Sequence, residues 1–99
     1  MLKHLVFFNM KDEGDIAQAN AEKMIAMLRA LPAAIPQIAE LNCGINIKDG
    51  AAACHVGLYM AFANEEDLEI YRTHPAHLEV VAFIGKVTAQ RWFVDYFSD

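Results

Sequence analysis

Hydrophobic residues alternate along four short stretches of the chain and recur at helical spacing along two longer ones. The alternating stretches are 2–10, 40–47, 54–62 and 90–97, and their β-branched and aromatic content predicts strands. After the first of them, apolar residues fall on one side of a predicted helix at Ala17, Ala21, Met24 and Leu28. A second helix is predicted to start with the stretch 64–67, whose acidic residues form its first turn. The order βαββαβ, in a single domain spanning residues 1–99, is that of an α+β ferredoxin-like sandwich.

The helix ends carry recognisable signals. Asp15 is expected to cap the first helix, with Gln18 in capping-box spacing, and Asn64 is expected to cap the second. Pro75 divides the second helix, because the residue before a proline is disfavoured in helical geometry and a proline suits a first helical position. We therefore expect His74 to cap the second helical piece.

The sheet is predicted to be apolar on both faces, so the face that the helices leave open needs cover. We assign to that open face a set of residues that alternate along the strands: Val6, Phe8, Val56, Leu58, Met60 and Phe93. Trp92 and Tyr96, on the alternate face of the last strand, are then expected to pack under the helices. A monomer rarely exposes so much apolar surface, and 56% of the 99 residues are hydrophobic. We predict a homodimer in which two sheets face each other and close an α/β barrel.

Charge and cysteine content exclude several classes of protein. The net charge is −5, and the eight Lys and Arg residues are dispersed, which argues against binding to nucleic acid or to an anionic membrane surface. No apolar stretch is long enough to span a membrane and no signal peptide is recognisable, so we expect a cytoplasmic protein. Cys43 and Cys54 are expected to be free thiols in that compartment, with a cross-strand disulfide as the alternative, because they flank a predicted hairpin turn.

The segment 71–77, Tyr-Arg-Thr-His-Pro-Ala-His, holds the candidate chemistry. Tyr71 and His77 lie on either side of the Pro75 break, where the kink can direct both side chains to one spot. A histidine can accept and return a proton near neutral pH, and a tyrosine hydroxyl in a dry pocket can donate to a developing oxyanion. The alternative is a structural corner in which Tyr71 packs on the sheet and His77 bonds to backbone. Two histidines three residues apart resemble metal spacing, but zinc needs three or four such ligands, so we expect no metal.

Three further polar residues are predicted to face the same space. His4 and Asp95 lie on strands that are neighbours in this fold, so we expect them to meet, either as a structural polar plug or as helpers of His77. Arg91 shares the face of Asp95 and either neutralises that carboxylate or receives the carboxylate of a substrate.

With these residues in place, the chain resembles the stress-responsive dimeric α/β-barrel (Dabb) family over essentially its whole length. The matching segments are 3–8 (KHLVFF), 44–46 (GIN), Phe62, 71–77 (YRTHPAH) and 94–96 (VDY). The resemblance implies a homodimer formed through the sheet faces.

In the plant olivetolic acid cyclase of this family, which closes a linear polyketide by aldol condensation, Tyr71 and His77 correspond to the catalytic pair, and His4 and Asp95 to pocket residues. Three residues of this chain differ from those at the corresponding pocket positions of that enzyme: Val56, Asn46 and Leu28. The resemblance therefore implies the acid–base pair for this chain but does not identify its substrate.

These observations lead to three candidate functions, of which the first needs neither a metal nor an organic cofactor. The first is a cofactor-free cyclase or aldolase-like enzyme acting on a polyketide-like carbonyl compound. Its Tyr71–His77 pair would sit above an apolar pocket, lined by Val6, Phe8, Val56, Leu58, Phe93 and Arg91. The second is a non-catalytic stress-responsive or small-molecule-binding protein. The third, ranked last, is a cofactor-free or haem-dependent monooxygenase of the antibiotic-biosynthesis type, for which a tryptophan is missing from the third strand.

Overall fold

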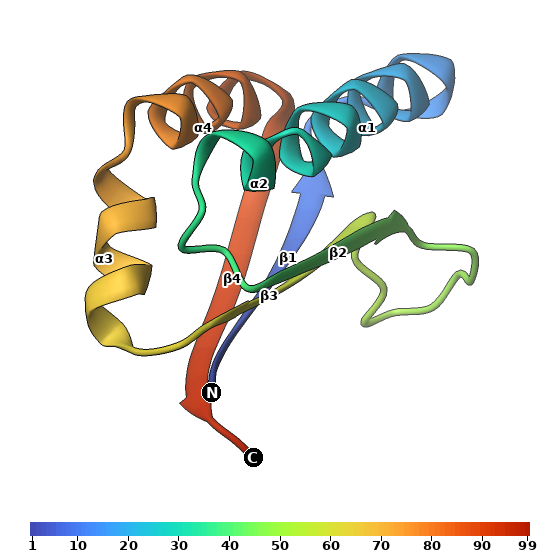
Figure 1. Cartoon of the computed structure of the whole chain (residues 1–99). Coiled ribbons are helices and arrows are strands. Elements are labelled where there is room, and N and C mark those ends of the chain that lie inside the picture. The colour runs from blue at the N-terminus through green and yellow to red at the C-terminus, as the bar shows by residue number, and fades with distance from the viewer.

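The computed structural model describes all residues 1–99 and has the predicted order of elements, with one additional short helix between the first helix and the second strand (Figure 1). The elements are β1 (Leu2–Met10), α1 (Gly14–Arg29), α2 (Leu31–Ala34), β2 (Glu40–Ile45), β3 (Val56–Phe62), α3 (Glu65–Thr73), α4 (Pro75–Val87) and β4 (Thr88–Phe97). The one-turn α2, which carries Pro32 in its first turn, was not predicted from the sequence. None of the helices is long and apolar enough to cross a membrane.

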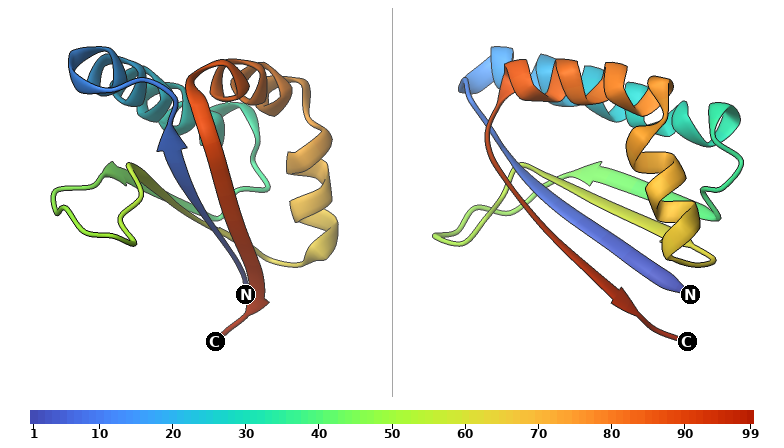
Figure 2. Two further views of the ribbon diagram at one scale, coloured as in Figure 1. Left: turned by 180° about the vertical axis from the view of Figure 1, so that it is seen from behind. Right: turned by 90° about the vertical axis from the view of Figure 1, so that its left-hand side faces the viewer.

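The four strands form one antiparallel sheet in the order β2-β3-β1-β4. Two views of the ribbon show every helix on the same side of this sheet, with both chain ends at one edge of the molecule (Figures 1 and 2). The first and last strands are neighbours, as predicted, and their register places His4 opposite Asp95. The fold is therefore ferredoxin-like.

Two of the three predicted helix caps are present. The side-chain oxygen of Asn64 accepts a 2.8 Å hydrogen bond from the Asp67 N–H at the start of α3. His74 breaks the helix as predicted, and its Nδ1 accepts a 3.0 Å hydrogen bond from the Ala76 N–H at the start of α4. The Asp15 cap is wrong: the N-cap position is Glu13, so α1 begins at Gly14, two residues before the start that a cap at Asp15 implies, and it has no side-chain cap. Gly14 adopts a φ of 61°, a left-handed conformation natural to glycine, which turns the chain into the helix sooner than the sequence signal indicated.

The core lies between the sheet and the helices, and it corrects the predicted assignment of the two sheet faces. Most of the residues that we assigned to the open face are buried under the helices: Val6, Phe8, Val56, Leu58 and Met60. The open face instead carries the alternate set, in which Phe7, Trp92, Val94 and Tyr96 are 40%, 46%, 47% and 45% exposed. Trp92 and Tyr96 therefore do not pack under the helices. The prediction failed because both sets are largely apolar, so alternation alone could not identify the face that the helices cover.

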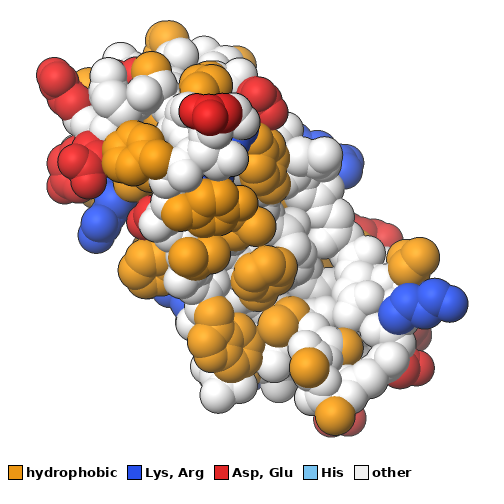
Figure 3. Space-filling view, turned by 90° about the horizontal axis from the view of Figure 1, so that it is seen from below, with side chains coloured by type: hydrophobic (Ala, Val, Ile, Leu, Met, Phe, Trp, Pro, Cys, Tyr) orange, Lys and Arg blue, Asp and Glu red, His pale blue; other side chains and the backbone are white.

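The open face is hydrophobic over a continuous band, with charged side chains mostly at its margins (Figure 3). Cys43 lies on the covered face opposite Leu58, and both Cys43 and Cys54 are free thiols, so the cross-strand disulfide is not formed.

Candidate functional site

A cavity of about 290 Å³ lies between the covered face of the sheet and the helices α3 and α4. Its floor is apolar and comes from strands and helices alike: Val6, Phe8, Leu28, Leu58, Val81 and Ile84. Its polar side chains are His4, Tyr71, Arg72, His77, Arg91 and Asp95, and Leu78 and Phe93 complete the lining. A hydrophobic hollow with a few convergent polar groups is typical of a small-molecule site.

The break between α3 and α4 brings Tyr71 and His77 together. Tyr71 lies two residues before the end of α3, and His77 lies in the first turn of α4. Because His74 caps α4 and Pro75 occupies its first turn, the segment forms two separate helices that meet at an angle, and not one continuous helix. The ring centroids of Tyr71 and His77 are 4.0 Å apart. The break in the helical backbone within segment 71–77 is thus what brings its tyrosine and its second histidine into contact.

Tyr71 is held as a neutral hydrogen-bond donor. The residue is only 2% exposed, and its ring packs against Phe62 with centroids 5.3 Å apart. Burial raises the pKa of the Tyr71 hydroxyl well above its usual range, and the nearby positive charge of Arg91 opposes this only partly. The hydroxyl takes part in none of the side-chain hydrogen bonds within the chain. Its proton is therefore available to a ligand in the cavity.

His77 is held as a neutral base. Its Nδ1 lies 3.1 Å from the backbone carbonyl oxygen of Arg72, and since a carbonyl oxygen only accepts, Nδ1 carries the proton of this hydrogen bond. Burial, with smaller contributions from the charges around it, lowers the pKa of the imidazole, although the carbonyl contact acts in the opposite direction. The ring is consequently neutral near pH 7, and Nε2 keeps a lone pair. The backbone contact predicted by the structural-corner alternative is real, and it fixes the tautomer that a base requires.

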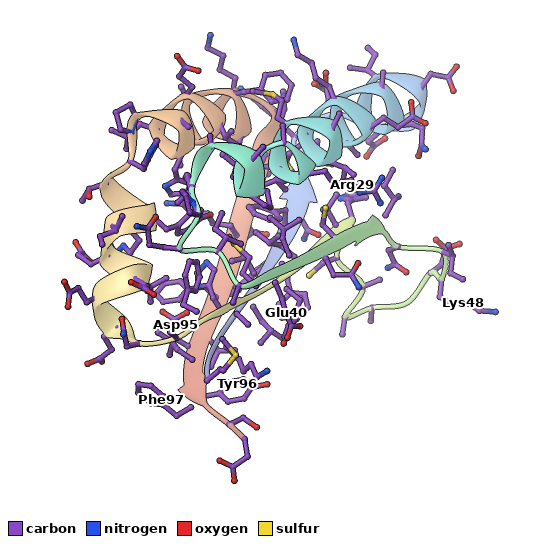
Figure 4. The ribbon with its side chains drawn as sticks, viewed as in Figure 1. Arg29, Glu40, Lys48, Asp95, Tyr96 and Phe97 are labelled. Carbon is purple, nitrogen blue, oxygen red and sulfur yellow. The ribbon has the colours of Figure 1, made fainter.

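His4 and Asp95 meet as the register predicts. Nδ1 of His4 contacts Oδ1 of Asp95, and the two side chains are 13% and 26% exposed. Figure 4 places Asp95 on the α3 side of β4, consistent with its position in the cavity lining. The His4 ring also lies edge-on to Tyr71, with centroids 6.1 Å apart. An ionised carboxylate can only accept, so this contact directs the Nδ1 proton of His4 toward Asp95 and leaves Nε2 free.

Two arginines bring positive charge to the cavity. The His4–Asp95 contact is the only side-chain contact in the chain between a basic residue and a carboxylate at salt-bridge distance, so neither Arg91 nor Arg72 is paired with a carboxylate. Of the two alternatives for Arg91, neutralisation of Asp95 is not observed, because His4 takes that carboxylate. The charge of Arg91 nevertheless reaches the site, since it acts on both Tyr71 and His77. An unpaired guanidinium beside an apolar hollow suits an organic acid.

Comparison with known proteins places this chain in a family. The model of the stress-responsive A/B barrel domain, Dabb, matches residues 2–98. The chain belongs to the Dabb family. No curated protein matches the sequence.

Among solved structures, a dimeric ferredoxin-like protein of unknown function from Bacteroides fragilis is 28% identical to this Dabb chain, with a TM-score of 0.85 over 96% of this chain and 93% of the other. A dimeric ferredoxin-like protein from Thermobifida fusca is 25% identical, with a TM-score of 0.84 over 96% and 88%. A hydroxynitrile lyase from Passiflora edulis is 19% identical, with a TM-score of 0.85 over 99% and 93%, a likeness that shows the fold alone.

Within this Dabb domain, nine of the ten predicted site residues line the one cavity. Val56 is the exception: it is buried in the core and borders a separate groove beside the β2–β3 loop. The sequence analysis did not name Arg72, Leu78, Val81 or Ile84 as cavity residues. Arg72 follows Tyr71 within the motif and could have been identified there, and the other three continue the helical stripe after Pro75.

Proposed function

We propose that this Dabb protein is a homodimer whose cavity, one in each protomer, binds a small carbonyl-bearing organic acid and closes its chain by a cofactor-free aldol-type condensation. The observation that carries the proposal is the pairing of the neutral donor Tyr71 with the neutral base His77, their rings 4.0 Å apart in an apolar cavity. Such a pair combines the acid and the base that enolate chemistry needs.

The reaction balances without a metal or an organic cofactor. Nε2 of His77 removes a proton from the carbon beside a carbonyl group, and the electron pair of that C–H bond moves onto the carbonyl oxygen. The Tyr71 hydroxyl donates a hydrogen bond to this enolate oxygen. The enolate carbon then attacks a second carbonyl carbon of the same molecule, forming the new C–C bond, and the resulting alkoxide takes the proton back from the His77 imidazolium.

The remaining polar residues hold and orient the substrate. Arg91 binds the carboxylate as an unpaired cation. The Asp95 carboxylate fixes the ring of His4, whose free nitrogen can receive a hydroxyl or carbonyl group of the substrate. The apolar floor accommodates the hydrocarbon portion, and expulsion of water from it strengthens each of these polar contacts.

Two further observations support the homodimer. The open face of the sheet exposes Phe7, Trp92, Val94 and Tyr96 together, more apolar surface than a monomer normally leaves in water. The structures from Bacteroides fragilis and Thermobifida fusca are both described as dimeric.

Linear carboxylic acids that carry at least two ketone groups, one to form the enolate and one to be attacked, test the proposal. We expect wild-type protein to convert one of them into a cyclic product, and Tyr71→Phe and His77→Gln to lose at least about 100-fold in turnover, the usual scale for acid–base residues. Tyr59→Phe is the matched control, because it removes a tyrosine hydroxyl from the open face, where Tyr59 contacts Lys3.

Saturable binding without turnover would favour the non-catalytic small-molecule-binding alternative. Absence of both binding and turnover across the series would refute the proposal. The monooxygenase alternative stays ranked last, because the single tryptophan, Trp92, lies on the face of the sheet away from the cavity.

A further inference from the structure

Two positively charged side chains lie at the mouth of the cavity. Arg72 comes from α3, in the layer of helices, and Arg91 comes from β4, in the sheet. Both residues are exposed, whereas Tyr71, which lines the same cavity, is almost fully buried. The two arginines therefore occupy opposite walls of the entrance, and Tyr71 lies deeper than either.

Neither arginine is neutralised by a carboxylate of its own chain. Glu69 precedes Arg72 by three residues on α3, a spacing at which acidic and basic side chains commonly pair, but the two form no ion pair. Asp95 shares the cavity side of β4 with Arg91, but its carboxylate is held by His4. Two guanidinium groups are thus available at one entrance, and a single carboxylate can pair with only one of two groups on opposite walls.

The charges of the two arginines reach the acid–base pair unequally. Burial is the main influence on both side chains, raising the pKa of Tyr71 and lowering that of His77. In addition, the charge of Arg91 lowers the pKa of both groups, whereas the charge of Arg72 lowers only the pKa of His77. Arg91 is therefore within electrostatic reach of both members of the pair, and Arg72 lies on the His77 side. A ligand that contacts both arginines passes over the pair.

The polarity of the cavity determines how such a ligand lies. The floor is apolar, and an ionised carboxylate is costly to bury without a partner, so the charged ends of the ligand stay at the mouth while its uncharged middle enters. A chain held at both ends in this way is bent back on itself. An intramolecular condensation requires such a bend, because two carbonyl groups of one molecule have to approach each other, and fixing both ends supplies the bend before the reaction begins.

We propose that Arg72 forms a second anion-binding subsite and that the substrate is a short oxo-dicarboxylic acid, held at its two ends by Arg72 and Arg91 while its carbonyl-bearing middle bends into the cavity. The inference rests on the proposed function, which assigns one carboxylate to Arg91, and it adds the second anionic group and the bent conformation. The volume of about 290 Å³ is near the lower limit for small-molecule sites, which favours a short chain.

Binding of unreactive dicarboxylates tests the second subsite. Calorimetric titration compares saturated straight-chain dicarboxylates of about five to ten carbons, lengths suited to a small cavity, with the monomethyl esters of the same acids. At constant ionic strength, we expect the best dicarboxylate to bind wild type at least about 5-fold more tightly than its monomethyl ester, the scale of one charge pair at a solvent-accessible site. Arg72→Gln should abolish this difference, and Arg72→Lys, which keeps the charge, should retain most of it.

Lys48→Gln is the matched control, because it removes one positive charge from a side chain that points away from the cavity (Figure 4). It should bind both ligands as wild type does. Thermal melts confirm that each variant is folded, and the contact of the Arg72 carbonyl oxygen with His77 belongs to the backbone and is kept in all of them. If Arg72→Gln is unfolded, Arg72→Met, which keeps an aliphatic side chain without the charge, replaces it.

Three results would overturn the inference: equal affinity of wild type for a dicarboxylate and its monomethyl ester, a preference for the dicarboxylate that persists without the charge of Arg72, or no binding of any dicarboxylate. The proposed function would survive each of these results if wild type still converted a monocarboxylic diketone in a reaction that depends on Tyr71 and His77. Conversely, an Arg72-dependent preference for dicarboxylates, with no oxo acid turned over, would support the second subsite and refute the condensation.

Discussion

Replacing Tyr71 by phenylalanine separates a functional hydroxyl from a structural one. Tyr71 is almost fully buried, and in most such positions loss of a hydroxyl orphans a buried partner, at a cost of about 1–3 kcal/mol. Here the hydroxyl forms no hydrogen bond to another residue of the chain, and Asn9 Oδ1 is the only fully buried side-chain oxygen or nitrogen without a partner. The substitution therefore removes a group that borders the cavity and orphans nothing.

The aromatic ring carries the structural role of the residue. It packs against Phe62, His77 and His4, with centroids 5.3, 4.0 and 6.1 Å away, and phenylalanine retains all three contacts. We expect Tyr71→Phe to change the free energy of unfolding by less than about 1 kcal/mol. Tyr71→Ala, which empties the ring site, should cost about 3–5 kcal/mol, as other large-to-small aromatic changes in cores do.

Chemical denaturation measures both variants, and calorimetric titration with a β-oxo carboxylate measures ligand binding. The expected result is near-wild-type stability of Tyr71→Phe together with weakened ligand handling. A loss of 2 kcal/mol or more in Tyr71→Phe, on the scale of an orphaned group, with no ligand found for the wild type, would show that the hydroxyl is structural, and the enzymatic proposal should then be abandoned.

Four other variants test the geometry. Leu58→Asp should unfold the chain, because Leu58 is buried under the helices, whereas Val94→Asp on the open face should leave a folded monomer. Circular dichroism and sedimentation distinguish the two outcomes. A folded Leu58→Asp protein would contradict the assignment of the sheet faces. Because burial lowers the pKa of His77, the unfolded chain binds more protons than the folded one between that lowered pKa and about 6.5, so stability should fall as the pH falls through this window. The melting temperatures of wild type and His77→Gln, measured between about pH 7 and pH 5, should therefore become more similar as the pH falls. A constant difference between the two melting temperatures over this range would refute the effect of burial on His77. Arg91→Gln should weaken binding of a carboxylate ligand roughly 10-fold or more while leaving its neutral methyl ester unaffected, and equal losses for both would exclude a charge contact.

The order and adjacency of the strands could be predicted from the sequence because they depend on local signals. Alternation marked the strands, Asn64 and the His74–Pro75 pair marked helix boundaries, and the βαββαβ order then permits few topologies. The adjacency of β1 and β4 brought His4 and Asp95 together without further information.

The covered face could not be predicted, because that choice depends on the whole interior. On β1, Val6 and Phe7 are both apolar but point to opposite sides of the sheet, so hydrophobicity could not show which of the two faces the helices. Polar residues did not decide the question either: the set containing Phe7 includes Lys3 and Tyr59, but the set containing Val6 includes His4, Arg91 and Asp95. The tautomer of His77 could not be predicted either, because it follows from the distance between its Nδ1 and the Arg72 carbonyl oxygen.

Strands β1 and β4 each contribute consecutive residues to opposite sides of the sheet. On β1, Lys3 faces the open side and His4 the cavity; on β4, Trp92 lies between Arg91 and Phe93, both of which line the cavity. Because β4 pairs only with β1 and forms an edge of the sheet, nearly all of its residues remain exposed within one chain. Unpaired edges that are this apolar are a liability in water. Docking of a second copy on the open face would cover Trp92 and thereby restrain the strand that carries Arg91, Phe93 and Asp95. Dimerisation and ligand binding would then be coupled through the backbone of β4, although the two surfaces share no side chain.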